Sequence, residues 1–213
     1  FGGGVQSTTL VLKCLGGEIP RPEYVVFADT GSEMPHTYAT VERIKDMCIE
    51  GSLPFETVRY ETPLHEKYLK DNSLPVVGIR SCTSRWKIDP IKRFMRSIVG
   101  NGRGKVIANV WLGISTDERR RATPSNNKWT DRRYPLLDLN MSRDDCNHYL
   151  GKKGFGEVEK SGCFMCPYQS SKQWSKLKKN HPKLFDVSLE MEKRAKEVRG
   201  FRGGLWHSDR SIE

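Results

Sequence analysis

The feature that most constrains this chain is a run of glycines directly before a stretch typical of a helix. The segment Gly2–Thr8 reads GGGVQST, and an apolar stretch continues from it to Leu15. Glycines lack a Cβ, so the backbone can turn tightly and approach a ligand closely. The amides that begin a helix face an anion together with the positive end of the helix dipole. The sequence therefore predicts an anion-binding loop, with an ordinary glycine turn as the alternative.

Two common phosphate loops do not match this segment. A Walker loop carries a Lys before its Ser or Thr, and none is present here. The G-x-G-x-x-G fingerprint of dinucleotide-binding proteins would place its third glycine at Ser7. The loop instead resembles the pyrophosphate-binding PP-loop of the ATP pyrophosphatases, usually S-G-G-x-D-S, with Gln6 where Asp is commoner.

Two further segments resemble the same superfamily, particularly its phosphoadenosine-phosphosulfate (PAPS) reductases. A buried-strand pattern at Tyr24–Ala28 ends in Asp-Thr-Gly-Ser-Glu at 29–33, and another at Val106–Leu112 runs into Gly113, two acidic residues and three arginines. In open α/β sheets ligands bind beyond the carboxyl ends of the strands, so Asp29 is predicted to hold a nucleotide. The alternative for Asp29 is a helix cap followed by a turn.

A basic segment and a set of cysteines follow. Cys82-Thr83 stands before Lys87 in a C-T-x-x-x-K-I-x-P spacing that resembles a nucleotide-contacting segment of PAPS reductase-like proteins, although it is also a plausible basic helix start. Cys163 and Cys166 are two residues apart, a spacing that lets both sulfurs grip one metal; a thioredoxin-like redox pair is not excluded. Cys146 follows Ser142, a predicted helix cap, and its side chain is expected to point off the helix end. A shared [4Fe–4S] cluster, or alternatively structural Zn²⁺, is predicted at Cys82, Cys146, Cys163 and Cys166.

Length, charge and cysteine content limit the class of protein. The chain has 213 residues and six unevenly spaced cysteines, which favours a reducing, cytoplasmic setting over a disulfide scaffold. No apolar run approaches the length of a membrane span, and no signal peptide is visible. A strand should precede a loop of this kind, so we expect residues upstream of Phe1.

The net charge of +10 is unevenly distributed. Residues 80–133 hold 14 Lys or Arg against 4 Asp or Glu, an excess of ten. A solvated surface explains such charge, but a basic field also suits nucleotide phosphates or a nucleic acid backbone. We expect the acceptor to be DNA or RNA, held by Arg93, Arg96, Arg120 and the lysines of 172–183.

Together these segments predict a doubly wound, mostly parallel α/β sheet of the adenine nucleotide alpha hydrolase type. The expected division is a PP-loop domain at 1–140 and a helical, metal-binding subdomain at 141–213. The resemblance implies cleavage of ATP, with Mg²⁺, between its α- and β-phosphates, adenylation of an acceptor and attack by sulfur or nitrogen. A sulfur-donor protein such as a cysteine desulfurase is an implied partner, and no membrane is expected.

The resemblance also implies roles for single residues. The catalytic residues would be Ser7, Asp29, Lys87 and Arg121. The residues expected to bind ATP are Gly2, Gly3, Gly4, Val5, Gln6, Ser7, Thr8, Asp29, Thr30 and Gly113. One alternative is a PAPS reductase, although such enzymes carry a cysteine in a C-terminal Glu-Cys-Gly-Leu-His tail and Gly-Leu-Trp-His at 204–207 has none. Another is a non-catalytic, zinc-containing module that binds nucleic acid.

Overall fold

The structure, a computed structural model, describes residues 1–100, 108–125, 128–206 and 210–212. The chain forms two compact units that are interleaved along the sequence. Unit 1 comprises residues 1–28, 35–58 and 91–161, and unit 2 comprises residues 29–34, 59–90 and 162–213. This partition differs from a division at residue 140, because residues 141–161 belong to unit 1.

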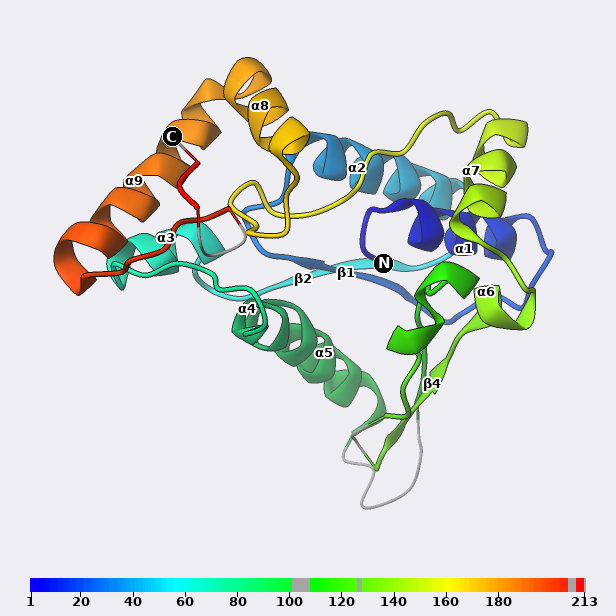
Figure 1. Cartoon of the computed structure of the whole chain (residues 1–213). Helices are drawn as coiled ribbons and strands as arrows, with labels where there is room; N and C mark the ends of the chain where they lie inside the picture. Colours follow the sequence, from blue (N-terminus) through cyan, green and yellow to red (C-terminus); the bar gives the residue numbers. More distant parts are fainter. Residues whose placement is uncertain (101–107, 126–127, 207–209, 213) are drawn as a thin grey trace. The chain divides into compact units, whose positions relative to one another are not determined.

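Unit 1 carries the strands of the α/β architecture (Figure 1). Two strands, β1 (Val25–Asp29) and β2 (Phe55–Arg59), are neighbours in one sheet and are joined through the helix α2 (Pro35–Glu50); their last residues, Asp29 and Arg59, fall in unit 2. In a second sheet, β3 (Ala108–Trp111) pairs in parallel with β4 (Thr130–Arg133). The described strands thus form two two-stranded sheets. The strand predicted at 24–28 is confirmed within a residue; of the strand predicted at 106–112, residues 106 and 107 lie outside the described residues.

Helices complete unit 1 and enclose its core. They are α1 (Val5–Leu15), most of α5 (Asp89–Val99), a 3₁₀ helix (Thr116–Arg121), α6 (Pro135–Asp138) and α7 (Arg143–Lys152). The apolar side of α1 packs against α7 and α2, around the fully buried Ile44 and Leu136. As predicted, Ser142 caps α7: its Oγ accepts from Asp145 N at 3.1 Å, and the Asp145 carboxylate accepts from Ser142 N.

Unit 2 is helical. Its elements are α3 (Leu64–Lys70), α4 (Ser81–Thr83), a π-helical turn (Ser84–Ile88), α8 (Ser171–Asn180) and α9 (Pro182–Arg199). The helices α3 and α8 pack on α9, and the core between them contains Leu177, Met191 and Leu205, none of which is exposed. The helix α9 starts at a proline and ends at Gly200 in the left-handed region, as proline and glycine preferences at helix ends dictate.

None of the described helices combines the length and the apolar character needed to cross a membrane.

Candidate functional site

The predicted anion loop lies in unit 1, and its glycines are needed for steric reasons. Gly3 has a φ of +68°, and a Cβ there would come within 2.8 Å of Thr37 Cγ2. A Cβ at Gly4 would lie 2.9 Å from Ser161 Oγ. The helix α1 starts directly after these glycines, and its first backbone bond runs from Thr8 N to Gly4 O at 3.0 Å. The amides of residues 5–7 therefore precede the hydrogen-bonded ladder of the helix.

Ser7 closes this loop. Its Oγ accepts from the backbone N–H groups of Gly2 and Gly4, both at 3.3 Å, and donates to Gly4 O at 3.0 Å. The hydroxyl of Thr8 is fully buried and has no hydrogen-bond partner among the described residues. Such an orphaned hydroxyl is uncommon in folded proteins and is often found beside a site that receives a ligand or water.

The segment after β3 packs on the same loop. A Cβ at Gly113 would lie 2.9 Å from Ser7 N and 3.0 Å from Ser7 Cα and Gln6 C, so only glycine fits against the start of α1. Gln6 is buried, and its Nε2 donates to Ser115 Oγ at 3.5 Å and to Glu118 Oε2 at 3.3 Å. Two segments that the sequence assigned separately to ATP binding thus meet at Gly113.

The predicted catalytic Arg121 is exposed and forms an ion pair with Glu118. Because Glu118 also accepts from Gln6, a chain of polar contacts leads from Arg121 to the loop. Asp117 accepts from Ser115 Oγ and from the backbone N–H of Arg143, which holds its carboxyl pKa below the usual range.

Asp29 and the residues after it belong to unit 2. The Asp29 carboxylate is 4% exposed; it accepts from Gly31 N at 2.8 Å and from Arg59 Nη2 at 2.5 Å. Ser32 Oγ accepts from His65 N at 3.1 Å and bonds to His65 Nδ1 at 2.8 Å. Burial lowers the pKa of His65, which favours a neutral ring. Hydrogen bonds therefore hold the 29–34 loop against the start of α3, a contact that the sequence did not predict.

The predicted catalytic Lys87 is held by a carboxylate that the sequence did not single out as a partner. Lys87 Nζ lies 2.8 Å from Glu33 Oε1, and the Glu33 side chain is only 1% exposed. Burial alone would lower the pKa of Lys87, but the attraction of Glu33 and of the neighbouring thiolates outweighs it and raises that pKa. Thr30 Oγ1 also donates to Glu33 Oε1, at 3.1 Å.

Three of the four predicted metal-binding cysteines lie in unit 2. Cys163 Sγ is 3.3 Å from Thr30 Oγ1 and donates to Glu33 Oε1 at 3.7 Å. Burial, followed by the Glu33 carboxylate, raises the pKa of this thiol well above its usual value. Cys163 is fixed there because Glu33 and Cys163 form an antiparallel bridge. Cys82, Cys163 and Tyr68 all pack against the apolar core of unit 2.

The fourth cysteine, Cys146, lies in unit 1, and the expectation that its side chain points off the helix end is wrong. It is 0% exposed, in the apolar core with Leu150 and Val5, and burial raises the pKa of its thiol. An amphipathic helix turns its fourth residue after the cap inward when the core lies on that side. Among the described residues, no group of three or more His, Cys, Asp or Glu is arranged to hold a metal ion. The four-cysteine centre stays a prediction.

No protein-family model matches the chain. Two uncharacterized proteins of Methanocaldococcus jannaschii are similar in sequence. MJ0066 is 28% identical over 204 residues, 87% of this chain and 39% of that protein. MJ0973 is 25% identical over 208 residues, 91% of this chain and 47% of that protein. The chain therefore spans less than half the length of either relative.

Among solved structures, the fold is similar to a PAPS reductase. The structure in question is the phosphate complex of phosphoadenylyl-sulfate (PAPS) reductase from Candida auris, with a TM-score of 0.49 and 12% sequence identity. The similarity covers 71% of this chain and 69% of that one.

Proposed function

We propose that this chain is an ATP pyrophosphatase that transfers AMP to an acceptor and releases pyrophosphate. The observation that supports the proposal is the contact of Gly113 with the backbone at Gln6 and Ser7. Gly113 leaves no room for a Cβ against the backbone at the helix start, and Gly3 has a φ of +68°, as suits a backbone cradle for phosphate. The orphaned hydroxyl of Thr8 beside the cradle is a further polar group available there.

The proposed chemistry uses this chain mainly to position groups and to neutralise charge. The amides at the start of α1 would bind the β- and γ-phosphates, and Ser7 keeps the loop closed. An acceptor oxygen attacks the α-phosphorus, its bond to the bridging oxygen breaks, and pyrophosphate leaves. Sulfur or nitrogen then displaces AMP from the acceptor. Mg²⁺ bound with ATP would offset the charge of the departing pyrophosphate.

The products distinguish the alternatives. With ATP, Mg²⁺ and an acceptor, we expect AMP and pyrophosphate, with Ser7→Ala and Asp29→Ala impaired and Ser171→Ala, on the exposed surface of α8, unchanged. ADP and inorganic phosphate would contradict the assignment. Sulfite released from PAPS in the presence of a dithiol would favour a PAPS reductase instead. Absence of any ATP turnover would favour a non-catalytic nucleic-acid-binding module.

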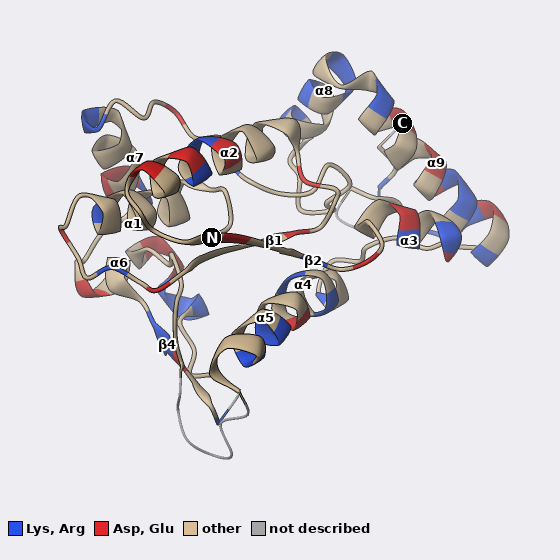
Figure 2. Cartoon of the chain, turned by 180° about the vertical axis from the view of Figure 1, so that it is seen from behind, with Lys and Arg blue, Asp and Glu red and all other residues tan. Residues whose placement is uncertain are grey.

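Nucleic acid is the acceptor class that we propose. Residues 172–183 contain five lysines and no acidic residue, and Lys172, Lys176 and Lys179 lie on one exposed side of α8, named here the α8 lysine face (Figure 2). A cation in the first helical turn, such as Lys172, opposes the helix dipole. In the described part of the chain Lys172 and Lys179 form no ion pair, whereas α9 pairs Glu190 with Arg194. An external polyanion would offset the mutual repulsion of these lysines and their unfavourable interaction with the helix dipole.

A metal centre is the remaining part of the proposal. Cys82, Cys163 and Cys166 all belong to unit 2, and Cys82 and Cys163 pack against the same apolar core, which supports common ligation. Anaerobic purification followed by iron, zinc and sulfide counts tests it. Serine at any of these three should reduce the metal content, whereas Cys14→Ser and Cys48→Ser, in the core of unit 1, should not. Cys146→Ser decides whether the fourth predicted ligand takes part.

A further inference from the structure

A cavity of about 510 Å³ is lined by residues of unit 2. It is bounded by α3, the segment 71–79 and the helical turns that begin at Ser81. Its volume falls within the range of roughly 300–1,000 Å³ that is usual for small-molecule sites. Leu74, Val76 and Ile79 make one side apolar, and Ser73, Ser81 and Ser84 supply hydroxyls.

The π-helical turn at Ser84–Ile88 forms one wall of this cavity. Such turns are rare and occur frequently at functional sites. Trp86 fixes the turn, because its Nε1 donates to Thr62 O at 2.8 Å and its ring packs on Tyr60 with the centroids 5.0 Å apart. Arg85, directly before Trp86, and Asp89, the first residue of α5 directly after the turn, also line the cavity. The turn and the start of α5 therefore present two opposite charges to the cavity.

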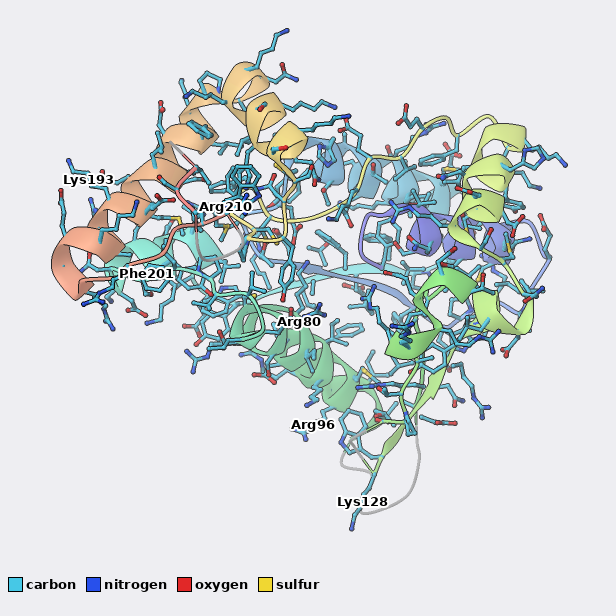
Figure 3. All side chains as sticks on the ribbon, in the orientation of Figure 1. Arg80, Arg96, Lys128, Lys193, Phe201 and Arg210 are labelled. Carbon is cyan, nitrogen blue, oxygen red and sulfur yellow. The ribbon has the colours of Figure 1, made fainter. Side chains whose placement is uncertain are left out.

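Another part of the lining lies close to the thiols. Tyr68 lines the cavity and, like Cys82 and Cys163, packs against the apolar core of unit 2. The hydroxyl of Tyr168, two residues after Cys166, accepts from Gly78 N at 2.9 Å, and Arg80, labelled in Figure 3, lies over the Tyr168 ring at 5.6 Å. The segment that closes the cavity is thus attached to the chain that carries Cys163 and Cys166.

The charges of the lining narrow the class of ligand. Lys67 and Asp71 form an ion pair with each other, with 2.6 Å between Nζ and Oδ2. Within the described residues, Arg85 and Asp89 form no ion pair. The lining therefore offers one cation and one carboxylate and has no net charge, which does not favour a polyanion such as ATP. A molecule with one carboxylate and one ammonium group matches it.

We propose that this cavity binds a low-molecular-weight zwitterionic thiol, between a free amino acid and a tripeptide in size. Its carboxylate would pair with Arg85, its ammonium group with Asp89, and its sulfur would lie towards Tyr68 and Ser81, on the side of the three cysteines. The assignment of a thiol group to the ligand rests on the proposed function, in which this ligand would be the source of sulfur. The assignment of its carboxylate and ammonium groups rests only on the charges of Arg85 and Asp89. Aromatic rings such as those of Tyr68 and Trp86 also make favourable contacts with sulfur.

Calorimetric titration of the full chain with L-cysteine, without ATP and under anaerobic conditions, tests the proposal. Cysteamine lacks the carboxylate, 3-mercaptopropionate lacks the ammonium group, and L-serine lacks the sulfur; each should bind about fivefold more weakly or worse, as expected for the loss of one partly exposed polar contact. Arg85→Gln should remove the preference for cysteine over cysteamine. Asp89→Asn should remove the preference for cysteine over 3-mercaptopropionate.

Two further variants keep the result interpretable. Ser84→Trp fills the cavity and should abolish binding, whereas Ser97→Trp, an exposed position on α5, should not. Equal binding of L-serine, binding of adenosine in place of thiols, or unchanged binding by Ser84→Trp would each overturn the proposal. Release of pyrophosphate from ATP is measured separately without thiol, so its failure contradicts the proposed function and leaves the cavity result intact.

Discussion

The contact of Gly113 with the phosphate loop gives the sharpest prediction. In Gly113→Ala, the new Cβ would lie 2.9 Å from Ser7 N and 3.0 Å from Ser7 Cα and Gln6 C, whereas an ordinary contact begins at 3.4 Å. The opposing atoms are backbone, so rotation of a side chain does not relieve the overlap. The start of α1 must move by about 0.5 Å, and overpacking of this kind costs about 1–3 kcal/mol of unfolding free energy.

The same displacement would disturb ATP cleavage if the amides of α1 hold the phosphates. A misplacement of 1 Å can reduce a rate about 100-fold, so a shift of half that size predicts a loss of about tenfold in kcat/KM. Pyrophosphate release measures the activity, and urea unfolding monitored by circular dichroism measures the stability.

Gly151→Ala is the matched control for this variant. Gly151 lies in α7, and a Cβ there meets nothing within 4 Å. Alanine should therefore stabilise that helix by up to about 1 kcal/mol and leave the activity unchanged. If Gly113→Ala keeps both the stability and the kcat/KM of the native chain, the cradle argument is refuted. If it loses stability but not kcat/KM, the contact is structural and the loop does not bind the phosphates.

Three other predictions concern charges. Lys87→Met leaves the buried Glu33 carboxylate without its cation and should lower the unfolding free energy by up to about 3 kcal/mol; Glu33→Gln added to it should restore much of that loss in urea unfolding. The carboxyl pKa of Glu18 is lowered to about 2 by hydrogen bonds from Lys13 and Tyr149. Its contribution to the unfolding free energy is therefore complete above the unfolded pKa of about 4.3 and is lost as the pH falls towards 2. Glu18→Gln should flatten the dependence of the unfolding free energy on pH across this range, and an unchanged dependence would contradict the prediction. Glutamate at the three positions of the α8 lysine face should reduce the salt slope for duplex DNA by up to about 0.9 per lysine. Glutamate at the exposed Lys152 and Lys193 (Lys193 is labelled in Figure 3) and at the half-buried Lys45 should change it little for the same change in net charge. Equal effects of the two sets would indicate a general field and not a binding surface.

Features that depend on a few neighbouring residues could be predicted from the sequence. The glycine run predicts the loop, because glycine readily adopts φ values such as the +68° of Gly3 and other residues rarely do. The strand before Asp29 follows from its β-branched and aromatic residues, and the start of α7 follows from the hydrogen-bonding capacity of Ser142. In each case the deciding interactions are made within one or two turns of chain.

The tertiary structure alone decided which distant side chains meet. Glu33 and Lys87 are 54 residues apart and pair because the 29–34 loop and the π-helical turn belong to the same unit. Ser32 finds His65 in the same way. Cys146 shows the converse, since its place after the cap Ser142 suggested a side chain that points off the helix end, but its helix face is buried in the core of unit 1. Sequence spacing fixes the local direction of a side chain, whereas the burial of apolar surface across the whole unit selects the face of each helix that turns inward.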